Sequence, residues 1–337
     1  MKATFQKYTL QFKRPAGTSR GVLTEKPTWL LTIEHNGRYG IGECSPLPGL
    51  SIDDLSDYER SKLLWTCTHI SLGKEVLWEQ LKGYPSIQFG VEQAFLSLEA
   101  AQEGVLFPSA FTQGKEAIPI NGLIWMGDKD YMQQQIREKL AQGFHCIKMK
   151  IGAIDFDTEY QLLKNIRQEY APSDIELRVD ANGAFSPLEA LEKLKRLADL
   201  QIHSIEQPIR AGQYEQMARL CEASPLPIAL DEELIGIACE KRKEEMLKII
   251  KPAYIILKPS LIGGYKGSEE WITLAQELGV GWWITSALEG NVGLSAIAQW
   301  TYTLGNPMPQ GLGTGSLYTN NFPSSLEVKN GGLWWIK

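Results

Sequence analysis

From about residue 118 onward, short apolar segments alternate with amphipathic helical patterns, and this alternation constrains the fold more than any other feature. The apolar segments are "IPINGLIW", "CIKMKIG", "IELRVDAN", "HSIEQPI", "LPIALDEE", "YIILKPS", "WWITSAL" and a last short one near "GLGTGS". Helical patterns lie between them, at about 128–142, 155–171, 187–200, 212–223, 238–249 and 266–278. Strands that alternate with helices in this way are typical of β/α barrels. We therefore predict an α/β protein with a (β/α)7β TIM-like barrel.

The segments before and after this array have a different pattern. "ATFQKYTLQFKR" and "TWLLTIEHNGRYGIGECSP" have the period of two expected of strands, and "HNGRYG" is a hairpin signal. Helical patterns such as "GVEQAFLSLEAAQEG" follow. We expect an α+β capping domain over residues 1–115 and a barrel domain over 116–314. The strand-like tail, 315–337, is expected to return to the cap.

Charged or polar side chains end most of the predicted barrel strands. In the second strand, Lys148 and Lys150 share one face, because successive side chains of a strand alternate. Later strands end in Asp180 and Asn182, Glu206, Asp231 and Glu232, Lys258, and Ser286. Roughly 26 residues, about one strand–helix unit, separate each of these positions on strands three to six from the next. The carboxyl ends of barrel strands form the active-site mouth, so we expect these side chains to meet there.

Three of these residues, Asp180, Glu206 and Asp231, place carboxylates on adjacent strands, where they would repel one another. A divalent cation removes this conflict, and an all-oxygen site suits Mg²⁺, with Mn²⁺ as a substitute. Lysines on strands two and six lie on opposite sides of an eight-stranded barrel. We therefore expect a small-molecule carboxylate substrate between them, bound to the metal.

Each residue has a simpler explanation when it is taken alone. Lys148 and Lys150 could face solvent at a strand end, and Asp180 could form only a turn with the residues after it. Glu206 could be a surface charge, Asp231 could cap a helix, and "GLGTG" could be a structural turn. The functional interpretation is favoured because the simpler ones would all have to hold at one rim.

The motifs "KMK", "DANGAF", "IEQPI", "DEE", "LKPS" and "GG" (263–264), in this order, resemble those of the enolase superfamily, in its muconate-lactonizing-type subgroup. The resemblance covers nearly the whole chain. It implies that Lys150 is the catalytic base, that Lys148 is its companion and that Lys258 is the opposing lysine. It also implies the metal ligands Asp180, Glu206 and Asp231. Members of this superfamily use a lysine base together with Mg²⁺ to form and stabilise an enediolate.

Within the subgroup, "SALEGNVGLSAIAQW" and "PQGLGTGSLYTNN" resemble members that dehydrate a succinyl-cyclohexadiene carboxylate to an aromatic acid in menaquinone biosynthesis. The cap segments "RPAGTSRG" (14–21) and "ECSPLPGLS" (43–51) resemble the two loops that close over that substrate. The implied substrate-binding residues are Ser286, Gly313, Thr314, Ser19, Leu50 and Asn182.

Two other classes of function remain open. The first is a racemase or epimerase of N-acyl amino acids or dipeptides, or a muconate cycloisomerase, in the same superfamily. Dipeptide epimerases carry an Asp-x-Asp pair near the eighth strand, and "GLGTGS" has no carboxylate, which disfavours a dipeptide substrate. The second is a non-catalytic barrel that only binds, which the complete set of carboxylates and lysines disfavours.

Charge and composition exclude some partners. The net charge of −6 gives no basis for binding nucleic acid or an anionic membrane. No apolar run reaches the roughly 18 residues of a membrane-spanning helix. The five cysteines are scattered and lack metal-ligand spacing, which predicts free thiols in the cytoplasm. The sequence leaves open whether the chain is a monomer or a homo-oligomer.

Overall fold

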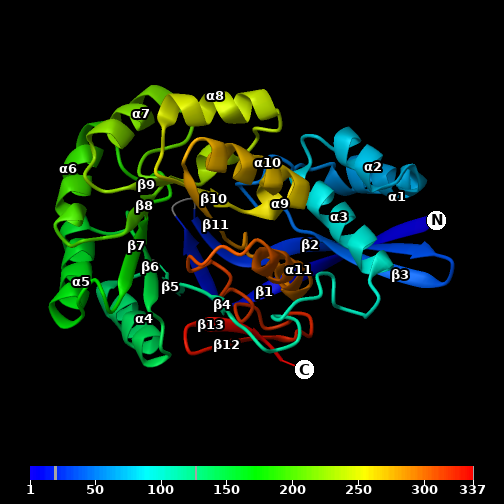
Figure 1. The fold of residues 1–337 in the computed structure, drawn as a ribbon, viewed down its shortest axis with the longest axis horizontal. Helices are drawn as coiled ribbons and strands as arrows, with labels where there is room; N and C mark the ends of the chain where they lie inside the picture. The colour runs from blue at the N-terminus through cyan, green and yellow to red at the C-terminus, as the bar shows by residue number, and fades with distance from the viewer. Residues whose placement is uncertain (19–20, 126, 337) are drawn as a thin grey trace.

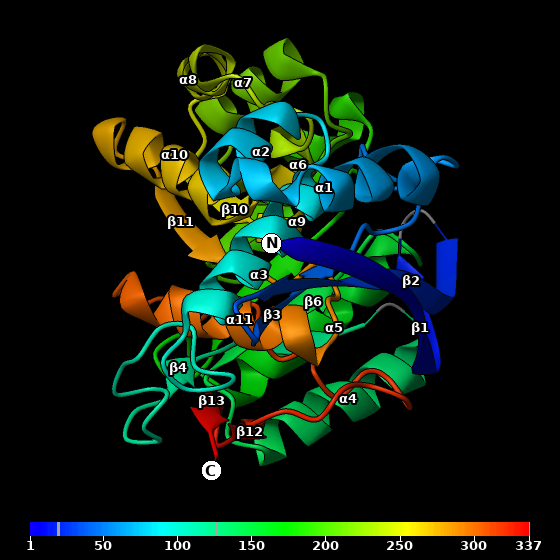
Figure 2. The same ribbon diagram turned by 90° about the vertical axis from the view of Figure 1, so that its right-hand side faces the viewer.

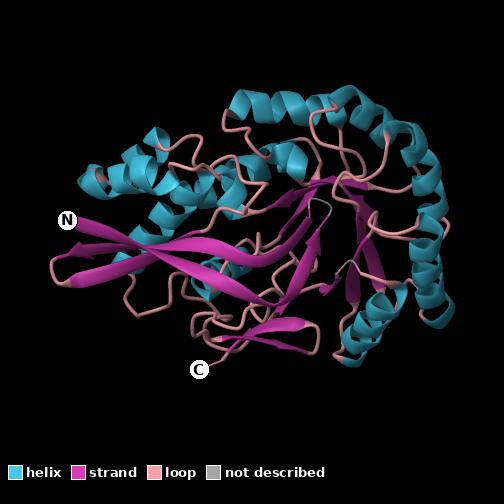
Figure 3. Cartoon of the chain, turned by 180° about the vertical axis from the view of Figure 1, so that it is seen from behind, coloured by secondary structure: helices cyan, strands magenta, loops and turns pink. Residues whose placement is uncertain are grey.

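The computed structural model describes residues 1–18, 21–125 and 127–336, and places a cap of strands and short helices beside a barrel (Figure 1). The cap elements are β1 (Lys2–Thr18), β2 (Gly21–His35), β3 (Arg38–Cys44), the π-helix η1 (Glu59–Leu63), α1 (Leu64–Thr68), the 3₁₀ helix η2 (Ile70–Leu72), α2 (Lys74–Gln80) and α3 (Pro85–Glu99). The long β1–β2 hairpin runs from the cap towards the barrel (Figure 3).

The cap forms because one face of its antiparallel sheet packs on α3. Trp29, Leu31 and Ile33 alternate along β2 and are buried on that face. On β3, a Cβ atom at Gly42 would overlap the backbone carbonyl of Gly90 on α3, so the absence of side chains lets strand and helix backbones touch. The sheet is therefore fixed directly on the helix that also faces the barrel.

The barrel consists of parallel strands in sequence order with helices outside them, as the alternation predicts. Its strands are β5 (Gly122–Ile124), β6 (Cys146–Lys150), β7 (Glu176–Asp180), β8 (Ser204–Glu206), β9 (Ile228–Leu230), β10 (Tyr254–Leu257) and β11 (Gly281–Ile284). Its helical elements are α4 (Lys129–Ala141), α5 (Phe156–Glu169), α6 (Pro187–Ala198), α7 (Tyr214–Ala223), the 3₁₀ helix η3 (Glu232–Leu234), α8 (Glu240–Ile250), α9 (Pro259–Ile262), α10 (Gly264–Glu277) and α11 (Asn291–Thr303).

The eighth position of the barrel is occupied by only two bridging residues. Gln310 forms a parallel bridge with Ile120, and Gly311 forms one with Thr285 at the end of β11. The amides of Asn121 and Ser286 donate to the carbonyls of these two residues. This short connection closes the ring of strands and confirms the predicted barrel class.

The strand register explains how two lysines fit in an apolar strand. Ile147 and Met149 of β6 point outward and join the main core, whereas Lys148 and Lys150 point inward. Lys150 is opposite Asp180 on β7, which is opposite Glu206 on β8. The polar residues therefore lie at one level of the barrel interior.

The cap docks on the barrel through α2, α3, α9 and α10 (Figure 2, where the cap faces the viewer). Trp78 donates through Nε1 to the carbonyl of Gly263, at 2.8 Å. The carboxylate of Glu92 on α3 accepts from the amides of Tyr265 at 2.6 Å and Lys266 at 3.1 Å, at the first turn of α10. A Cβ atom at Gly264 would overlap this carboxylate, so the glycine leaves room for the cap.

The C-terminal tail contacts both parts of the chain. The amide of Thr319 donates to the carbonyl of Gln11 on β1, and Asn320 bonds to the same strand. Further along, β12 (Leu326–Lys329) and β13 (Gly332–Trp335) form a hairpin that pairs with β4 (Ile118–Pro119) below the barrel (Figure 1). The division of the chain into a cap, 1–115 with 315–337, and a barrel stays a prediction. None of the described helices is long and apolar enough to cross a membrane.

The Glu92 contact predicts how stability depends on pH. Burial raises the pKa of Glu92 to about 8, against the opposing effect of the two amides. The folded chain then holds a proton that the unfolded chain loses at its ordinary carboxyl pKa, so this residue lowers stability as the pH rises towards about 8. We expect Glu92→Gln, which does not titrate, to be less stable than wild type at pH 5 and to approach or exceed it at pH 8.5. Thermal unfolding across this range measures the difference.

A suitable control is Glu79→Gln. Glu79 also reaches α10, by a 3.0 Å contact with Lys266, but it is exposed, and its hydrogen bonds with Lys82 and Lys266 lower its pKa. This variant should keep the wild-type trend above pH 5. Parallel stability–pH curves for wild type and Glu92→Gln would contradict the assignment.

Candidate active site

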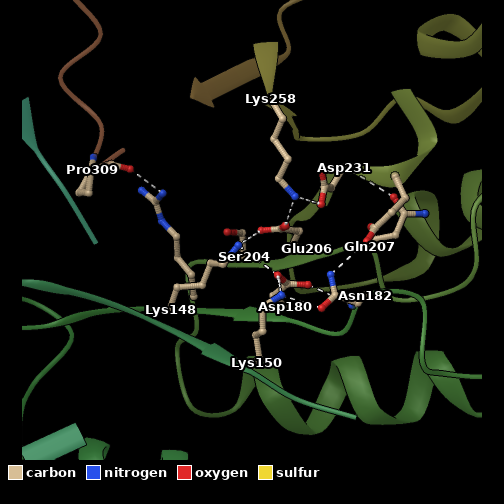
Figure 4. A network of polar contacts seen from close by, with 12 residues as sticks. Lys148, Lys150, Asp180, Asn182, Ser204, Glu206, Gln207, Asp231, Lys258 and Pro309 are labelled. Atoms are coloured by element: carbon tan, nitrogen blue, oxygen red, sulfur yellow. Dashed lines mark hydrogen bonds and ion pairs between the residues drawn. The ribbon is translucent and has the colours of Figure 1, made fainter. Parts of the chain in front are cut away.

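A cavity of about 810 Å³ opens at the carboxyl ends of the barrel strands, below the cap hairpin. Among its lining residues are Lys148, Lys150, Asp180, Asn182, Lys258, Leu50, Ser286, Gly313 and Thr314. In Figure 4 the three lysines approach the carboxylates from different sides. Glu206 and Asp231 form part of the same polar network and are buried. The structure thus brings the predicted lysines and carboxylates together.

Lys148 lies between two of the carboxylates. Its Nζ donates to Oε2 of Glu206 at 2.5 Å and lies 3.1 Å from Oδ2 of Asp180. Burial alone would lower the pKa of this lysine, but the negative charges of Asp180 and Glu206 outweigh burial and raise it. Lys148 is therefore an ammonium group fixed in the wall.

Lys150 lies one step closer to the mouth. Its Nζ donates to Oδ2 of Asp180 at 2.9 Å and to Oδ1 of Asn182 at 2.7 Å. Asn182 in turn donates through Nδ2 to Glu232 at 3.0 Å. Asn182 has a left-handed backbone, with φ of 43°, which asparagine tolerates better than most residues. Asn182 thus helps to hold the side chain of Lys150 in place.

Lys258 follows β10, across the barrel from β6. Its Nζ donates to Asp231 and lies 3.9 Å from Oε1 of Glu206. Burial would lower the pKa of Lys258, but Asp231 and Glu206 raise it above the ordinary value. The predicted layout, with lysines on opposite sides of three carboxylates, is therefore present in the geometry.

The carboxylates differ in their electrostatic environment. Burial favours the neutral acid at Asp180, but the three lysines outweigh burial and lower its pKa. At Glu206, burial and the charge of Asp180 raise the pKa well above its usual range. Mutual repulsion of neighbouring carboxylates, expected from the sequence, thus acts on Glu206.

The chemistry of these donors, although not their present spacing, suits a hard divalent cation. Three carboxylates come from neighbouring strands, and the buried Oε1 of Glu206 accepts no hydrogen bond from the described residues. All the donors are oxygen, as Mg²⁺ prefers. In the described parts of the chain, no three Asp, Glu, His or Cys side chains are spaced to hold an ion. Here the ammonium groups of Lys148 and Lys258 contact the carboxylate oxygens, so binding a cation would require these ion pairs to loosen.

The expected substrate contacts that the structure describes line the cavity. Leu50, from the cap segment 43–51, lines it together with the segment 12–16 of β1. Gly313 and Thr314 also line the cavity, near Ser286, whose hydroxyl accepts from Thr314 at 2.9 Å. Ser19 lies outside the described residues.

The sequence analysis did not identify the buried residues that hold the site side chains in position. Oε1 of Gln207 accepts from the amide of Asp231 at 3.2 Å, and its Nε2 donates to Glu233 at 2.9 Å. Gln207 also has a positive φ, 39°. The motif "IEQPI" points to this glutamine, but the bond to the next strand end is a tertiary contact without a local signal. Glu43, which is buried, was also missed as a supporting residue. Glu289 follows the predicted strand end at Ser286 and could have been a solvated loop charge, but it is fully buried.

Comparison with known proteins shows similarity over both the cap and the barrel. The family model described as "Enolase C-terminal domain-like" matches residues 131–334, and the model "MenC, N-terminal domain" matches residues 1–98. The chain is 50% identical to o-succinylbenzoate synthase of Desulfotalea psychrophila, over 99% of this chain and 98% of that protein. It is 27% identical to N-succinylamino acid racemase of Thermus thermophilus, over 93% and 86% of the two chains.

Solved structures give the same result. The crystal structure of MenC from Desulfotalea psychrophila superposes with a TM-score of 0.88 at 45% identity, covering 99% of both chains. L-Ala-D/L-Glu epimerase from Bacillus subtilis shares the fold, with a TM-score of 0.85 at 20% identity over 99% and 96% of the two chains. With the barrel model matching more than half of its length and a full-length relative at 50% identity, the chain belongs to the enolase superfamily.

Proposed function

We propose that the protein dehydrates 2-succinyl-6-hydroxy-2,4-cyclohexadiene-1-carboxylate to 2-succinylbenzoate, the activity of o-succinylbenzoate synthases in menaquinone biosynthesis. The observation that carries this proposal is the 50% identity to the Desulfotalea synthase, which extends through the cap as well as the barrel. The cap matters to this proposal because its residues 12–16, Leu47 and Leu50 border the cavity, whereas the barrel carboxylates and lysines suit several reactions of the superfamily.

The proposed metal ligands are Asp180, Glu206 and Asp231, in keeping with the divalent-metal dependence of the superfamily. A bound divalent cation would neutralise the substrate carboxylate and favour loss of the neighbouring proton. Mg²⁺ is the proposed ion, with Mn²⁺ as a substitute. A cation bound to Asp180, Glu206 and Asp231 would also offset the negative charges that raise the pKa of Lys148 and Lys258.

In the proposed mechanism, Lys150 acts as the base. Its amine removes the proton next to the substrate carboxylate, and the electron pair left on that carbon forms an enediolate. The same lysine then returns the proton to the hydroxyl group as it leaves, so that water departs from the face on which the proton was removed. Asn182 holds Lys150 in place, and Lys148 keeps a positive charge beside the ligands Asp180 and Glu206.

Lys258 has a different proposed role. It remains an ammonium group on the opposite face and stabilises the planar enediolate by its charge. The remaining proposed substrate contacts are Ser286, Gly313, Thr314, Leu50, Asn182 and Ser19. A cytoplasmic location stays a prediction, as does the choice between monomer and homo-oligomer.

A second candidate is racemisation of an N-acyl amino acid. Two observations favour it: the similarity to the Thermus racemase, and the position of Lys258 opposite Lys150, since a racemase needs an acid–base group on each face. The absence of a carboxylate from "GLGTGS" disfavours a dipeptide substrate.

Purified protein with Mg²⁺ should convert the cyclohexadiene substrate to 2-succinylbenzoate, measured by the ultraviolet change on aromatisation. EDTA should abolish turnover, and Mg²⁺ or Mn²⁺ should restore it, because the substrate carboxylate needs a cation. Asp231→Asn should weaken metal binding, measured by calorimetry, more than it weakens folding. The exposed Asp199→Asn is the control and should bind metal as wild type does. No aromatisation, but exchange of the α-proton of N-succinyl amino acids, would favour the racemase; full activity after chelation would refute the metal assignment.

The two lysines should respond differently to substitution. Lys150→Ala should be essentially inactive, because no neighbouring group replaces the base. Lys258→Ala should lose about 10²–10³ in kcat, the size of one electrostatic contribution, and Lys258→Arg should keep more activity because it keeps the charge. Turnover of the three variants, each with metal occupancy checked, tests this. Equal losses in both Lys258 variants would point to a second acid–base residue and a racemase-like site.

A further inference from the structure

A chain of hydroxyl groups lies behind the part of the cavity wall formed by the ends of β11 and the segment 311–316. The hydroxyl of Thr314 donates to Oγ of Ser286 at 2.9 Å, and Ser286 donates to Oε2 of Glu289 at 2.7 Å. Ser286 and Thr314 line the cavity, whereas Glu289 is fully buried behind them. This chain of hydroxyl groups therefore runs from the cavity to the carboxyl group of Glu289, which does not line the cavity.

Counting donors and acceptors fixes the direction of this chain. Oε2 of Glu289 also accepts from the amide of Ala287 at 2.8 Å, and its other oxygen accepts from Ser260. A serine hydroxyl offers one donor and two acceptor positions. Ser286 uses its donor on Glu289 and accepts from Thr314 and from the amide of Leu288 at 3.0 Å. Its hydroxyl is then fully occupied within the protein.

The consequence appears at Thr314, whose single hydroxyl proton points to Ser286. Its remaining lone pairs are the only hydrogen-bonding capacity that this hydroxyl can offer to the cavity. We propose that Glu289 is a positioning residue that makes the Thr314 hydroxyl an acceptor towards the ligand, so that this hydroxyl selects against a carboxylate or ketone oxygen and favours a donor or a water molecule. The inference rests on the proposed function for the identity of the ligand.

The cap holds Glu289 and its loop in this arrangement. Glu43 on β3 accepts from the amides of Gly290 and Gly293 at 2.7 Å each, at the start of α11, and from Thr28 at 3.0 Å. Lys26, fully buried on β2, lies near enough to both carboxyl groups for their charges to counter the lowering of its pKa by burial. The cap on one side and Ser260 on the other therefore fix the loop 286–290. With the loop fixed, the hydroxyl groups keep donating in one direction, from Thr314 to Ser286 and from Ser286 to Glu289.

The inference predicts different changes in Kd for Thr314→Val and Ser286→Ala. If these residues only supported the wall, both variants would change Kd in the same way. The probe is 2-succinylbenzoate, whose polar atoms at pH 7.5 are all acceptors, titrated by calorimetry into the Mg²⁺-loaded chain. Thr314→Val removes a hydroxyl that acts as an acceptor and therefore forms no hydrogen bond with the acceptor atoms of this ligand. It should change Kd less than about threefold. Ser286→Ala frees the Thr314 proton to donate to the ligand and should tighten binding about tenfold, the size of one hydrogen bond to a charged group. Ser286→Ala combined with Thr314→Val should return Kd to the wild-type value.

Variants of Glu289 separate its acceptor role from its charge. In Glu289→Gln the amide oxygen can accept from Ser286 and Ala287 while the amide nitrogen donates to Ser260, so Kd should stay within about threefold of wild type. Glu289→Ala removes the acceptor and should tighten binding as Ser286→Ala does. Ser260→Ala is the matched control: it removes a bond to Glu289 but leaves the chain direction unchanged, and should bind as wild type does. If Glu289→Ala fails to fold, Ser286→Ala and Thr314→Val decide the question.

A Kd weakened about tenfold or more by Thr314→Val would mean that Thr314 donates to the ligand, and would overturn the inference, as would unchanged or weaker binding in Ser286→Ala. Turnover of the cyclohexadiene substrate by wild type decides the proposed function separately. If wild type binds 2-succinylbenzoate but does not turn over the substrate, the proposed function fails and the Kd comparison still decides the role of Glu289. If it does not bind 2-succinylbenzoate, both fail.

Discussion

The site depends on one constraint: negative charge buried in the barrel must be matched by positive charge at the same level. Asp180 and Glu206 are almost fully buried, and Asp231 lies beside them. Isolated carboxylates in such a place would cost several kcal/mol each. Ion pairs with lysines compensate this cost, since every carboxylate in the group contacts at least one ammonium group. The proposed chemistry uses the same lysines. The side chains that compensate the buried negative charge are therefore also the proposed catalytic side chains.

The cap is joined to this arrangement by two further buried carboxyl groups. Glu92 accepts the first free amides of α10, just after Lys258 and α9, and Glu43 does the same at α11, just after Ser286. Each acceptor at a helix start satisfies amides that have no partner within the helix. Because both helices begin next to strand ends that line the cavity, docking of the cap also fixes the barrel loops that face the ligand. The position of the cap therefore influences the position of the barrel wall.

Much of this could be predicted from the sequence because it recurs with a period. Strand–helix units of similar length repeat the same rim position, so Asp180, Glu206, Asp231 and Lys258 could be placed together without a structure. The barrel closure was less accessible: the eighth strand is reduced to bridges at Gln310 and Gly311, too short to leave a pattern.

The supporting residues could not be predicted, because their partners are distant in the sequence. Glu92 and Glu43 look like ordinary residues of a helix and a strand, and only tertiary packing turns them into helix caps. Ser286 was found by its position, but the use of its hydroxyl by Glu289, Leu288 and Thr314 follows from hydrogen-bond geometry alone. A strand pattern predicts which face a side chain occupies, and it does not predict the direction of a hydroxyl proton.

The most direct test of the charge-matching constraint is a double-mutant cycle on Lys148 and Asp180, whose Nζ and Oδ2 atoms are 3.1 Å apart. Free energies of unfolding would be measured for wild type, Lys148→Met, Asp180→Asn and the double variant, in buffer without divalent cations. Each single change should be destabilising, by up to about 3–5 kcal/mol, because it removes one of the partners of a buried charge. Asp180 keeps its contact with Lys150, and Lys148 keeps its contact with Glu206. The double variant should be less destabilised than the sum of the singles, with a coupling energy of about 1–3 kcal/mol. Additive losses would contradict the account, since they would mean that the buried charges do not depend on one another.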